Sequence, residues 1–376
     1  MEAKTREFED AGLLDGLDGR DREARLALLR QLVEEGFSID ELREAAAEDR
    51  LGLLPVDRFL AGEPKYTGRD VARLAGLPLE FLFAVRQAMG LAVPDPDERV
   101  FGEQDLEAAK VTARLRDAGL PEEGLLEVTR VLGTGLAQSA EAMRMLVARW
   151  LLPQGVDERE LSGMTLAAAR ELLPLAAPLL QYTLTLHMRD QVRNQQYGLL
   201  ELSEGASTST RRVFVGFTDM VGFTRLGERI EITEIGRLLG RLSELAREAV
   251  RPPTRIVKTI GDAIMFVSPA PEPLLETSLT LTERVEAEGE EFPSIHSGLA
   301  GGVALSREGD WYGPPVNLAS RITDIARAGS VLASEELRDA APDRYAWSYT
   351  GEHKLRGVKR PVPLYRVRRL GTGLDD

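Results

Sequence analysis

The spacing of apolar residues divides the chain into two halves with different patterns. From residue 1 to about residue 200, leucine and alanine recur at helical spacing among arginine and glutamate, which predicts a succession of amphipathic helices. Glycine and proline interrupt this pattern at short intervals, so the helices should have ordinary lengths. One helix start is marked by Ser38 with Glu41 three positions later, which is the pattern of a capping box.

After about residue 210 the pattern changes to short apolar runs that alternate with amphipathic helical stretches. The predicted strands are 211–217, 255–258, 263–267, 297–305, 345–350 and 363–367, and the predicted helices are 232–250, 272–289 and 315–327. Residues 259–262 lie between two predicted strands and contain a glycine, which indicates a tight hairpin. The expected fold is therefore an all-α domain followed by a single α+β domain.

An apolar stretch, residues 172–188, leads out of the helical half into a polar segment and then a run of small residues. We expect a helical domain over 1–188, a long helix and linker over 189–210, and the α+β domain over 211–370. The apolar stretch has 17 residues, fewer than the ~20 that a membrane span needs. Three interpretations of it stay open: a buried packing helix, the wall of a cavity for a lipid-like ligand, or an element whose coil–helix balance transmits a signal.

The composition excludes several kinds of chemistry. The chain has no cysteine and only three histidines, far apart in sequence, so disulfides, thiol catalysis and cysteine-ligated zinc are excluded and a metal would need carboxylate ligands. The formal net charge of −14 repels nucleic acid and anionic membranes. The N-terminal residues are charged from the second position onward, so we expect no signal peptide and a cytoplasmic protein, with peripheral membrane association left open.

One segment of the helical half, residues 66–120, resembles a MerR-like helix-turn-helix. The likeness lies in residues 66–76 (YTGRDVARLAG), similar to that family's first helix and turn, and in residues 100–106 (VFGEQDL), similar to its wing and following helix. Nine basic and thirteen acidic residues lie between positions 61 and 130, whereas duplex DNA binding depends on neutralising phosphates. We therefore expect a helical scaffold here, with nucleic-acid binding as the alternative.

Two carboxylates stand where predicted strands end. Asp219 follows directly on an apolar strand, and Asp262 stands at the tip of the predicted hairpin. At neighbouring positions of a sheet edge, the two would bind one or two Mg²⁺ ions, although each alone is more commonly a solvated turn residue. Free N–H groups at the start of a following helix can hold phosphate oxygens, and the residues concerned are Gly222, Phe223 and Thr224.

The residues around these carboxylates resemble the sequence motifs of class III nucleotidyl cyclases. Residues 217–224 (FTDMVGFT) are similar to the first motif, 258–263 (KTIGDA) to the second and 309–321 (GDWYGPPVNLASR) to the third. The three motifs occur in the order of that family, and the resemblance covers about 206–370. It implies a ferredoxin-like βαββαβ-type catalytic domain that converts ATP to 3′,5′-cyclic AMP and pyrophosphate.

The resemblance also implies a role for each matching position. Asp219 and Asp262 would hold two divalent cations, Mg²⁺ or Mn²⁺. Lys258 would donate a hydrogen bond to adenine N1, and Asp310 would accept one from the N6 amine. Guanine would leave both of these side chains mispaired, so the resemblance implies ATP rather than GTP as the substrate.

Two further residues of the third motif carry roles by the same resemblance. Asn317 would orient the ribose, and Arg321 would stabilise the negative charge that develops at the α-phosphorus. Taken alone, Asn317 also fits a helix cap, and Arg321 also fits a charge that interacts with the C-terminus of a helix.

Lys258 and Asp262 flank the same tight turn, yet the family places the base reader and the metal ligand on opposite sides of the nucleotide. The resemblance therefore implies a head-to-tail homodimer with two composite sites. One chain would contribute Asp219 and Asp262 to each site. The other chain would contribute Lys258, Asp310, Asn317 and Arg321.

A helical half followed by a cyclase domain is similar in architecture to the autoinhibited, pH-responsive adenylyl cyclases of actinobacteria. This likeness implies that the helical domain regulates catalysis through the alignment of two catalytic domains, with mild acid as the signal. A lipid or fatty acid bound at residues 172–188 is a further expected partner. The alternative function is a nucleotide-sensing regulator whose helical half binds DNA.

Overall fold

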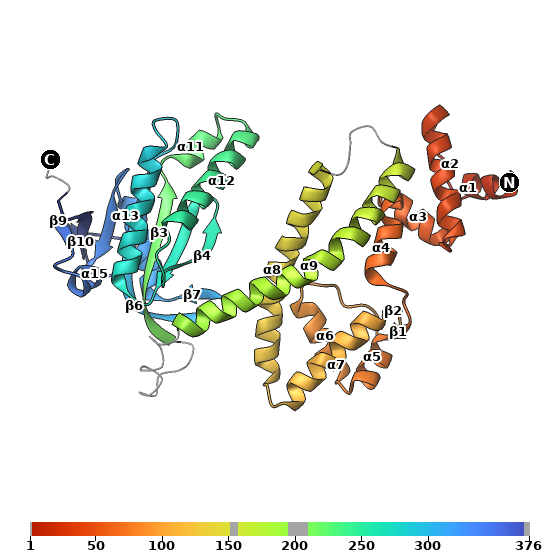
Figure 1. The fold of residues 1–376 in the computed structure, drawn as a ribbon, viewed down its shortest axis with the longest axis horizontal. Helices are drawn as coiled ribbons and strands as arrows, with labels where there is room; N and C mark the ends of the chain where they lie inside the picture. Colours follow the sequence, from red (N-terminus) through yellow and green to blue (C-terminus); the bar gives the residue numbers. More distant parts are fainter. Residues whose placement is uncertain (1, 151–156, 195–209, 372–376) are drawn as a thin grey trace. The chain divides into compact units, whose positions relative to one another are not determined.

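The computed structural model describes residues 2–150, 157–194 and 210–371 (Figure 1). The chain divides into two compact units, Met1–His187 and Met188–Asp376. Of the helix and linker predicted over 189–210, residues 195–209 lie outside the described residues, so the linker stays a prediction.

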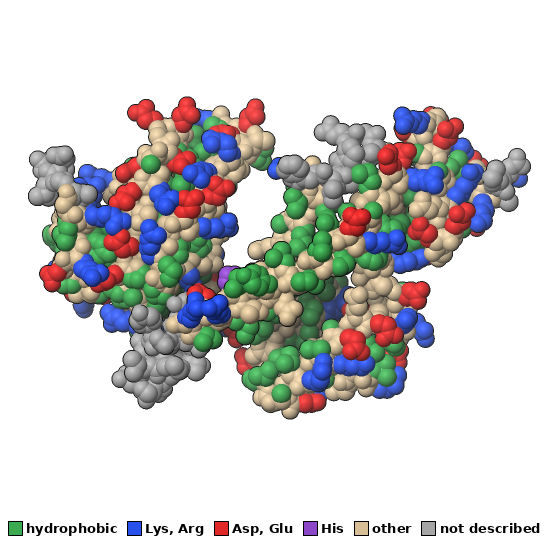
Figure 2. Space-filling view, in the orientation of Figure 1, with side chains coloured by type: hydrophobic (Ala, Val, Ile, Leu, Met, Phe, Trp, Pro, Cys, Tyr) green, Lys and Arg blue, Asp and Glu red, His purple; other side chains and the backbone are tan. Residues whose placement is uncertain are grey.

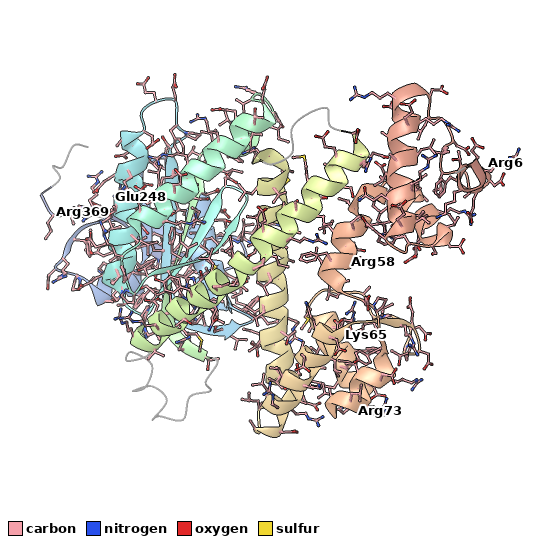
Figure 3. All side chains as sticks on the ribbon, turned by 45° about the vertical axis from the view of Figure 1, so that its right-hand side comes forward. Arg6, Arg58, Lys65, Arg73, Glu248 and Arg369 are labelled. Carbon is pink, nitrogen blue, oxygen red and sulfur yellow. The ribbon has the colours of Figure 1, made fainter. Side chains whose placement is uncertain are left out.

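The first unit is helical, as predicted, and its first lobe consists of α1 (Glu2–Asp10), α2 (Gly19–Glu34), α3 (Ile39–Ala47) and α4 (Leu54–Ala61). Leucines on α2 form the centre of its core, and Leu28, Leu29 and Leu32 are fully buried. The predicted capping box is confirmed at the start of α3, where the Ser38 N–H donates to the Glu41 carboxylate at 2.7 Å. The Arg58 guanidinium on α4 lies 3.3 Å from the centre of the Phe37 ring (Figure 3).

The second lobe has the helix-turn-helix arrangement that its sequence resembles. It consists of β1 (Tyr66–Thr67), α5 (Gly68–Ala75), α6 (Leu79–Ala88), β2 (Arg99–Phe101) and α7 (Glu103–Asp117), with β1 and β2 paired antiparallel. Several of its basic side chains, including the labelled Lys65 and Arg73 of Figure 3, form ion pairs with carboxylates: Lys65 with Glu103, Arg69 with Asp97, Arg73 with Asp70 and Lys110 with Glu107. These pairs offset the positive charge that a phosphate backbone would need.

The helix α8 (Glu122–Trp150) packs closely against the end of α6. Gly133 makes this approach feasible, because a Cβ atom at this position would lie only 2.7 Å from the Cα and carbonyl oxygen of Met89. At Gly135, on the same helix, a Cβ atom would meet nothing within 4 Å. Backbone contact with α8 therefore holds the C-terminal end of α6, the second helix of the helix-turn-helix lobe.

The helix α9 (Glu158–Asn194) contains the apolar stretch and continues into the first residues of the predicted 189–210 segment, and Pro174 and Pro178 lie inside it rather than ending it. Its apolar side chains between residues 172 and 188 are exposed in the single chain, and Leu175 is 69% exposed. Figure 2 shows hydrophobic side chains gathered along α8 and α9. The interpretation of this stretch as a buried packing helix is therefore wrong for the single chain. Within the described ranges, no helix combines the length and apolar character of a membrane span.

The second unit is built on a mixed sheet. Its strands are β3 (Thr210–Met220), β4 (Arg255–Ile260), β5 (Ala263–Ser268), β6 (Ile295–Arg307), β7 (Asp310–Tyr312), β8 (Val331–Ser334), β9 (Tyr345–His353) and β10 (Val362–Arg369). Their spatial order is β4-β5-β3-β6-β8-β10-β9, and β7 pairs with β6. The helices are α11 (Phe223–Gly227), α12 (Ile232–Ala249), α13 (Pro271–Ala287), α14 (Pro314–Ile325) and α15 (Glu335–Ala340).

The chain order β3-α12-β4-β5-α13-β6, with the spatial order β4-β5-β3-β6, is the ferredoxin-like arrangement that the resemblance implied. Alternate side chains of β3 face two cores: Phe214 packs with α12 and α13, whereas Val213 and Val215 pack on the face that α14 covers. All the predicted strands and helices of this unit are present. One placement is wrong, because Asp219 lies inside β3 rather than after it.

We expect Gly133→Ala to lower the melting temperature of the full chain. The added methyl group would meet the Met89 backbone, and overpacking of this kind costs about 1–3 kcal/mol. Gly135→Ala is the matched control, because its methyl group would meet open space and alanine is favoured over glycine inside a helix by about 0.5–1 kcal/mol. Circular dichroism measures both; equal melting temperatures in the two variants would contradict the close packing of α8 on α6.

Candidate active site

The sheet register brings the two predicted metal ligands together. β3 pairs antiparallel with β5, and Thr218 lies opposite Ile264. The next residue of β3, Asp219, therefore comes opposite the turn from β4 to β5, which carries Asp262. Gly261 allows this turn because its φ of +63° is a left-handed conformation that residues with a side chain rarely adopt.

The electrostatics of this carboxylate pair fit a divalent cation. Burial, together with the adjacent Asp262 carboxyl group, raises the pKa of Asp219 to about 7. One oxygen of Asp219, Oδ1, is buried and has no hydrogen-bond partner among the described residues. A cation would offset the repulsion between the two carboxylates and give the unpaired oxygen a ligand bond.

The site provides few protein ligands. Among the described residues, no group of three or more histidine, aspartate or glutamate side chains is arranged to hold a metal. Mg²⁺ is commonly bound by one or two carboxylates, with water and substrate phosphates as the remaining ligands. The Asp219–Asp262 pair fits this mode rather than an all-protein metal cage.

The predicted base-reading residues form an ion pair within one chain. Lys258 on β4 donates to Oδ2 of Asp310 on β7, and the side chains are 37% and 21% exposed. The other carboxylate oxygen, Asp310 Oδ1, accepts a hydrogen bond from the Trp311 main-chain N–H at 2.8 Å. Both oxygens of Asp310 therefore have a defined donor, and both side chains of the pair stay partly exposed to solvent.

A shift in register directs Lys258 toward this partner. Arg255 pairs with Val267 on β5, but after an irregularity between Ile256 and Lys258, Lys258 pairs with Met265. Val267 and Met265 face the same core, on the side of α14. Without the shift, Lys258 would fall opposite Ile264 and point to the other face of the sheet, because side chains alternate along a strand. Sequence patterning did not reveal this feature.

Asn317 and Arg321 lie one turn apart on α14, which places them on the same side of the helix. Asn317 is exposed, and Arg321 pairs with Asp324 of its own helix at 3.2 Å. The cap interpretation of Asn317 is wrong, because Gly313 occupies the N-cap position of α14. Both side chains are accessible to a ligand.

The predicted phosphate-binding residues begin a short helix. Gly222 is the N-cap of α11 in a left-handed conformation, and Phe223 and Thr224 form the first turn of this five-residue helix. A cavity of about 320 Å³ lies beside it and is lined by Gly222, Arg225 and Arg229 among others.

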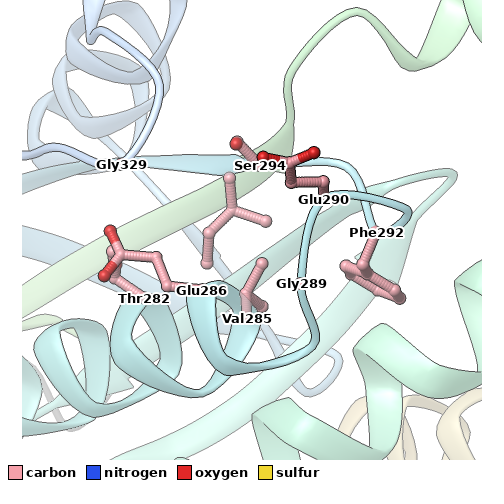
Figure 4. Close-up of a pocket in the computed structure, with 9 residues that line it drawn as sticks. Thr282, Val285, Glu286, Gly289, Glu290, Phe292, Ser294 and Gly329 are labelled. Atoms are coloured by element: carbon pink, nitrogen blue, oxygen red, sulfur yellow. The ribbon is translucent and has the colours of Figure 1, made fainter.

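A separate cavity of about 400 Å³ lies between the end of α13 and the start of β6 (Figure 4). Its lining includes Thr282, Glu286, Glu290 and Phe292. None of the residues predicted from the cyclase motifs lines it. The predicted site residues, including the Asp219–Asp262 and Lys258–Asp310 pairs, therefore lie outside this cavity.

The raised pKa of Asp219 predicts a pH-dependent stability for the metal-free protein. Its ordinary value is 3.8, so between about pH 4 and pH 7 the unfolded chain has released a proton that the folded chain retains. Stability should therefore fall as the pH rises through this window. Asp219→Asn should flatten the fall, and Mg²⁺ or Mn²⁺ added at pH 8 should raise the melting temperature of the unaltered protein only.

Thermal melts in chelator, from pH 4 to pH 8, test this expectation. Asp343→Asn, which changes an exposed aspartate far along the chain from both pairs, is the matched control and should keep the slope of the unaltered protein. Identical pH profiles for the unaltered protein and Asp219→Asn would show that the buried carboxylate pair does not exist in solution.

Comparisons with known proteins agree with the residue pattern. Residues 6–192 match the family described as "Adenylate cyclase regulatory domain". The chain is 39% identical to the pH-sensitive adenylate cyclase MT1302 of Mycobacterium tuberculosis, over 99% of this chain and 96% of the relative. It is 32% identical to an adenylate cyclase of Streptomyces coelicolor, over 85% of this chain and 84% of that relative.

Solved structures of cyclases resemble part of the chain. The adenylyl cyclase CyaB of P. aeruginosa aligns with 45% of this chain and 100% of its own, at 23% identity and a TM-score of 0.37. The catalytic core of a rhodopsin-guanylyl cyclase with converted specificity, in complex with ATPalphaS, aligns with 43% of this chain and 99% of its own, at 23% identity and a TM-score of 0.38.

Proposed function

The chain belongs to the class III adenylate cyclases that carry an N-terminal regulatory domain, and we propose that it forms cyclic AMP at two composite sites of a homodimer. The observation that carries this proposal is that the hairpin of β4 and β5 contributes one residue to each of two separate pairs of charged side chains. Asp262 at the turn contacts Asp219 of β3, and Lys258 on β4 contacts Asp310 of β7. One pair suits a metal–triphosphate, and the other suits the edge of a base.

The carboxylate pair is the proposed metal half-site. Asp219 and Asp262 would hold two Mg²⁺ or Mn²⁺ ions, which activate the ribose 3′-hydroxyl and neutralise the charge of the triphosphate and the departing pyrophosphate. The unpaired Oδ1 of Asp219 and the contact between the two carboxyl groups support this assignment. Backbone N–H groups in the first turn of α11 would bind phosphate oxygens, through Gly222, Phe223 and Thr224.

The ion pair is the proposed base half-site. Lys258 presents a donor to adenine N1, and Asp310 presents an acceptor to the N6 amine. Guanine carries a protonated N1 and a carbonyl at position 6, so each group would face a partner of its own kind. One unsatisfied polar group costs about 1–3 kcal/mol, which favours ATP over GTP by about fivefold to 150-fold.

The two exposed residues of α14 complete the proposed chemistry. Asn317 would hydrogen-bond the ribose and hold the 3′-oxygen in line with the α-phosphorus. Arg321 would leave its exposed partner Asp324 and stabilise the charge that develops at the α-phosphorus. Both lie on α14, which follows the β7 strand of Asp310 in the chain and contacts it, so they would join the base half-site.

Two chains are needed because one hairpin carries both halves. In this chain Lys258 is directed to β7, whereas Asp262 lies against β3. A two-fold axis would bring the metal half-site of one chain to the base half-site of the other, and would do so twice. The proposal therefore includes a homodimer with two equivalent active sites.

Mixing two inactive variants tests this arrangement. Asp219→Ala and Lys258→Ala should each lower cyclic AMP formation by about a hundredfold or more, because each removes part of both sites. After mixing, random exchange makes half of the dimers mixed, and each mixed dimer has one intact site. About a quarter of the original activity should return.

The control mixes Asp219→Ala with Asp262→Ala, whose lesions lie in the same half-site. No dimer of these two variants contains an intact site, so activity should stay at the level of the single variants. Recovery in the control mixture, or none in the first mixture, would rule out composite sites of this kind.

We propose that the helical unit regulates catalysis in response to pH, with a lipid or fatty acid as a further ligand. The sequence match to a regulatory domain and the pH-sensitive relative support the first part. The exposed apolar side chains between residues 172 and 188 support the second. The DNA-binding alternative finds no comparable support, because basic side chains of the helix-turn-helix lobe are paired with carboxylates.

Comparing the full chain with residues 206–376 tests this regulation. The ratio of their cyclase activities should differ between about pH 6 and about pH 8, because protons that act on the helical unit act only on the full chain. A fatty acid added to both should change only the activity of the full chain. An activity ratio that is the same at both pH values would remove pH from the account.

A further inference from the structure

Trp311 directly follows the base-reading Asp310 and is almost completely buried, with 2% of its surface exposed. It lies on β7, where it pairs with Ser306 of β6, and its ring packs into the core on the α14 face of the sheet. Its indole Nε1 has no hydrogen-bond partner among the described residues. The indole therefore contributes its bulk and its ring faces rather than its N–H group.

Two arginines from other strands contact this ring. The guanidinium carbon of Arg211, near the start of β3, lies 5.0 Å from the ring centre, and that of Arg255, at the start of β4, lies 5.8 Å from it. Cation–π attraction stabilises a guanidinium that lies within about 6 Å of an aromatic ring centre. We call these three residues the tryptophan clamp.

The clamp holds two like charges close together. Burial lowers the pKa of Arg255, and the nearby charge of Arg211 lowers it further, while the charge of Asp190 acts in the opposite direction. The negative face of an aromatic ring attracts a cation. Because the ring of Trp311 lies against both guanidinium groups, it offsets part of the repulsion between the two arginines.

The clamp is connected to Asp310 by the backbone. The Trp311 N–H donates to Asp310 Oδ1 at 2.8 Å, so the position of Trp311 sets the orientation of the Asp310 carboxylate. That orientation leaves Oδ2 toward Lys258. The three-residue strand β7 has few ladder hydrogen bonds of its own. The anchored ring of Trp311 therefore limits the movement of the neighbouring Asp310.

We propose that Arg211, Trp311 and Arg255 are positioning residues that set the choice between adenine and guanine by fixing the Asp310 carboxylate. This inference rests on the proposed role of Lys258 and Asp310 as base readers. A loosened Asp310 would rotate to meet the donor groups of guanine as well as the N6 amine of adenine. Loss of the clamp would therefore change base selectivity more than it changes the chemical step.

The test compares kcat/KM for ATP and for GTP in full-length variants. Trp311→Leu, which keeps an apolar side chain but removes both ring faces, should lower the ATP-to-GTP ratio by about tenfold, the equivalent of one misdirected hydrogen bond. Trp311→Phe should restore most of the ratio, because it returns an aromatic face. Arg211→Gln with Arg255→Gln should lower the ratio without changing the buried core.

Arg212→Gln is the matched control. Arg212 is exposed and follows Arg211 on β3, so its side chain points to the face of the sheet opposite that of Arg211. It should leave the ratio unchanged. The arginine double variant keeps the test decisive if Trp311→Leu fails to fold, as judged by its melting temperature.

The outcomes separate this inference from the function on which it rests. An unchanged ratio in the arginine double variant and in Trp311→Leu, with a lowered ratio in Asp310→Ala, would overturn the clamp alone. An unchanged ratio in Asp310→Ala and Lys258→Ala would overturn base reading by this pair, and the clamp with it.

Discussion

The hairpin of β4 and β5 constrains the whole catalytic unit, because its two charged residues have partners on different strands. Asp262 at its turn meets Asp219 of β3, and Lys258 within β4 meets Asp310 of β7. The register shift after Ile256 separates these roles, since it points Lys258 to the α14 face while the turn stays at the end of β3. The remaining strands of the sheet and both cores hold these two contacts in place, and in the proposed function each contact is half of an active site.

If each chain carries only half of each site, as proposed, the helical unit has a means of control. Positioning two reacting groups is worth several kcal/mol, and a displacement of about 1 Å between the halves is enough to lose much of it. Regulation then requires no contact between the helical unit and the nucleotide. It requires only that a signal change the alignment of two catalytic units, as rigid-body rotations and helix shifts do in other switching proteins.

The sequence predicted the parts whose signal is local. Short apolar runs located six strands of the second unit but not β7 or β8, the Ser38–Glu41 spacing located a helix start, and the cyclase motifs selected both charged pairs. The parts that depend on tertiary contacts were missed. A three-residue strand such as β7 is too short to show a period, and the register shift before Lys258 leaves no mark in composition. Asp219 was expected after its strand because aspartate is depleted inside strands.

The most direct test of the account is an experimental structure of the protein with Mg²⁺ and an ATP analogue that cannot cyclise. The account predicts a dimer in which each nucleotide has its phosphates at Asp219 and Asp262 of one chain. The adenine of the same nucleotide should lie against Lys258 and Asp310 of the other chain. A nucleotide that contacts all four residues of a single chain would contradict the composite site, and with it the need for a dimer.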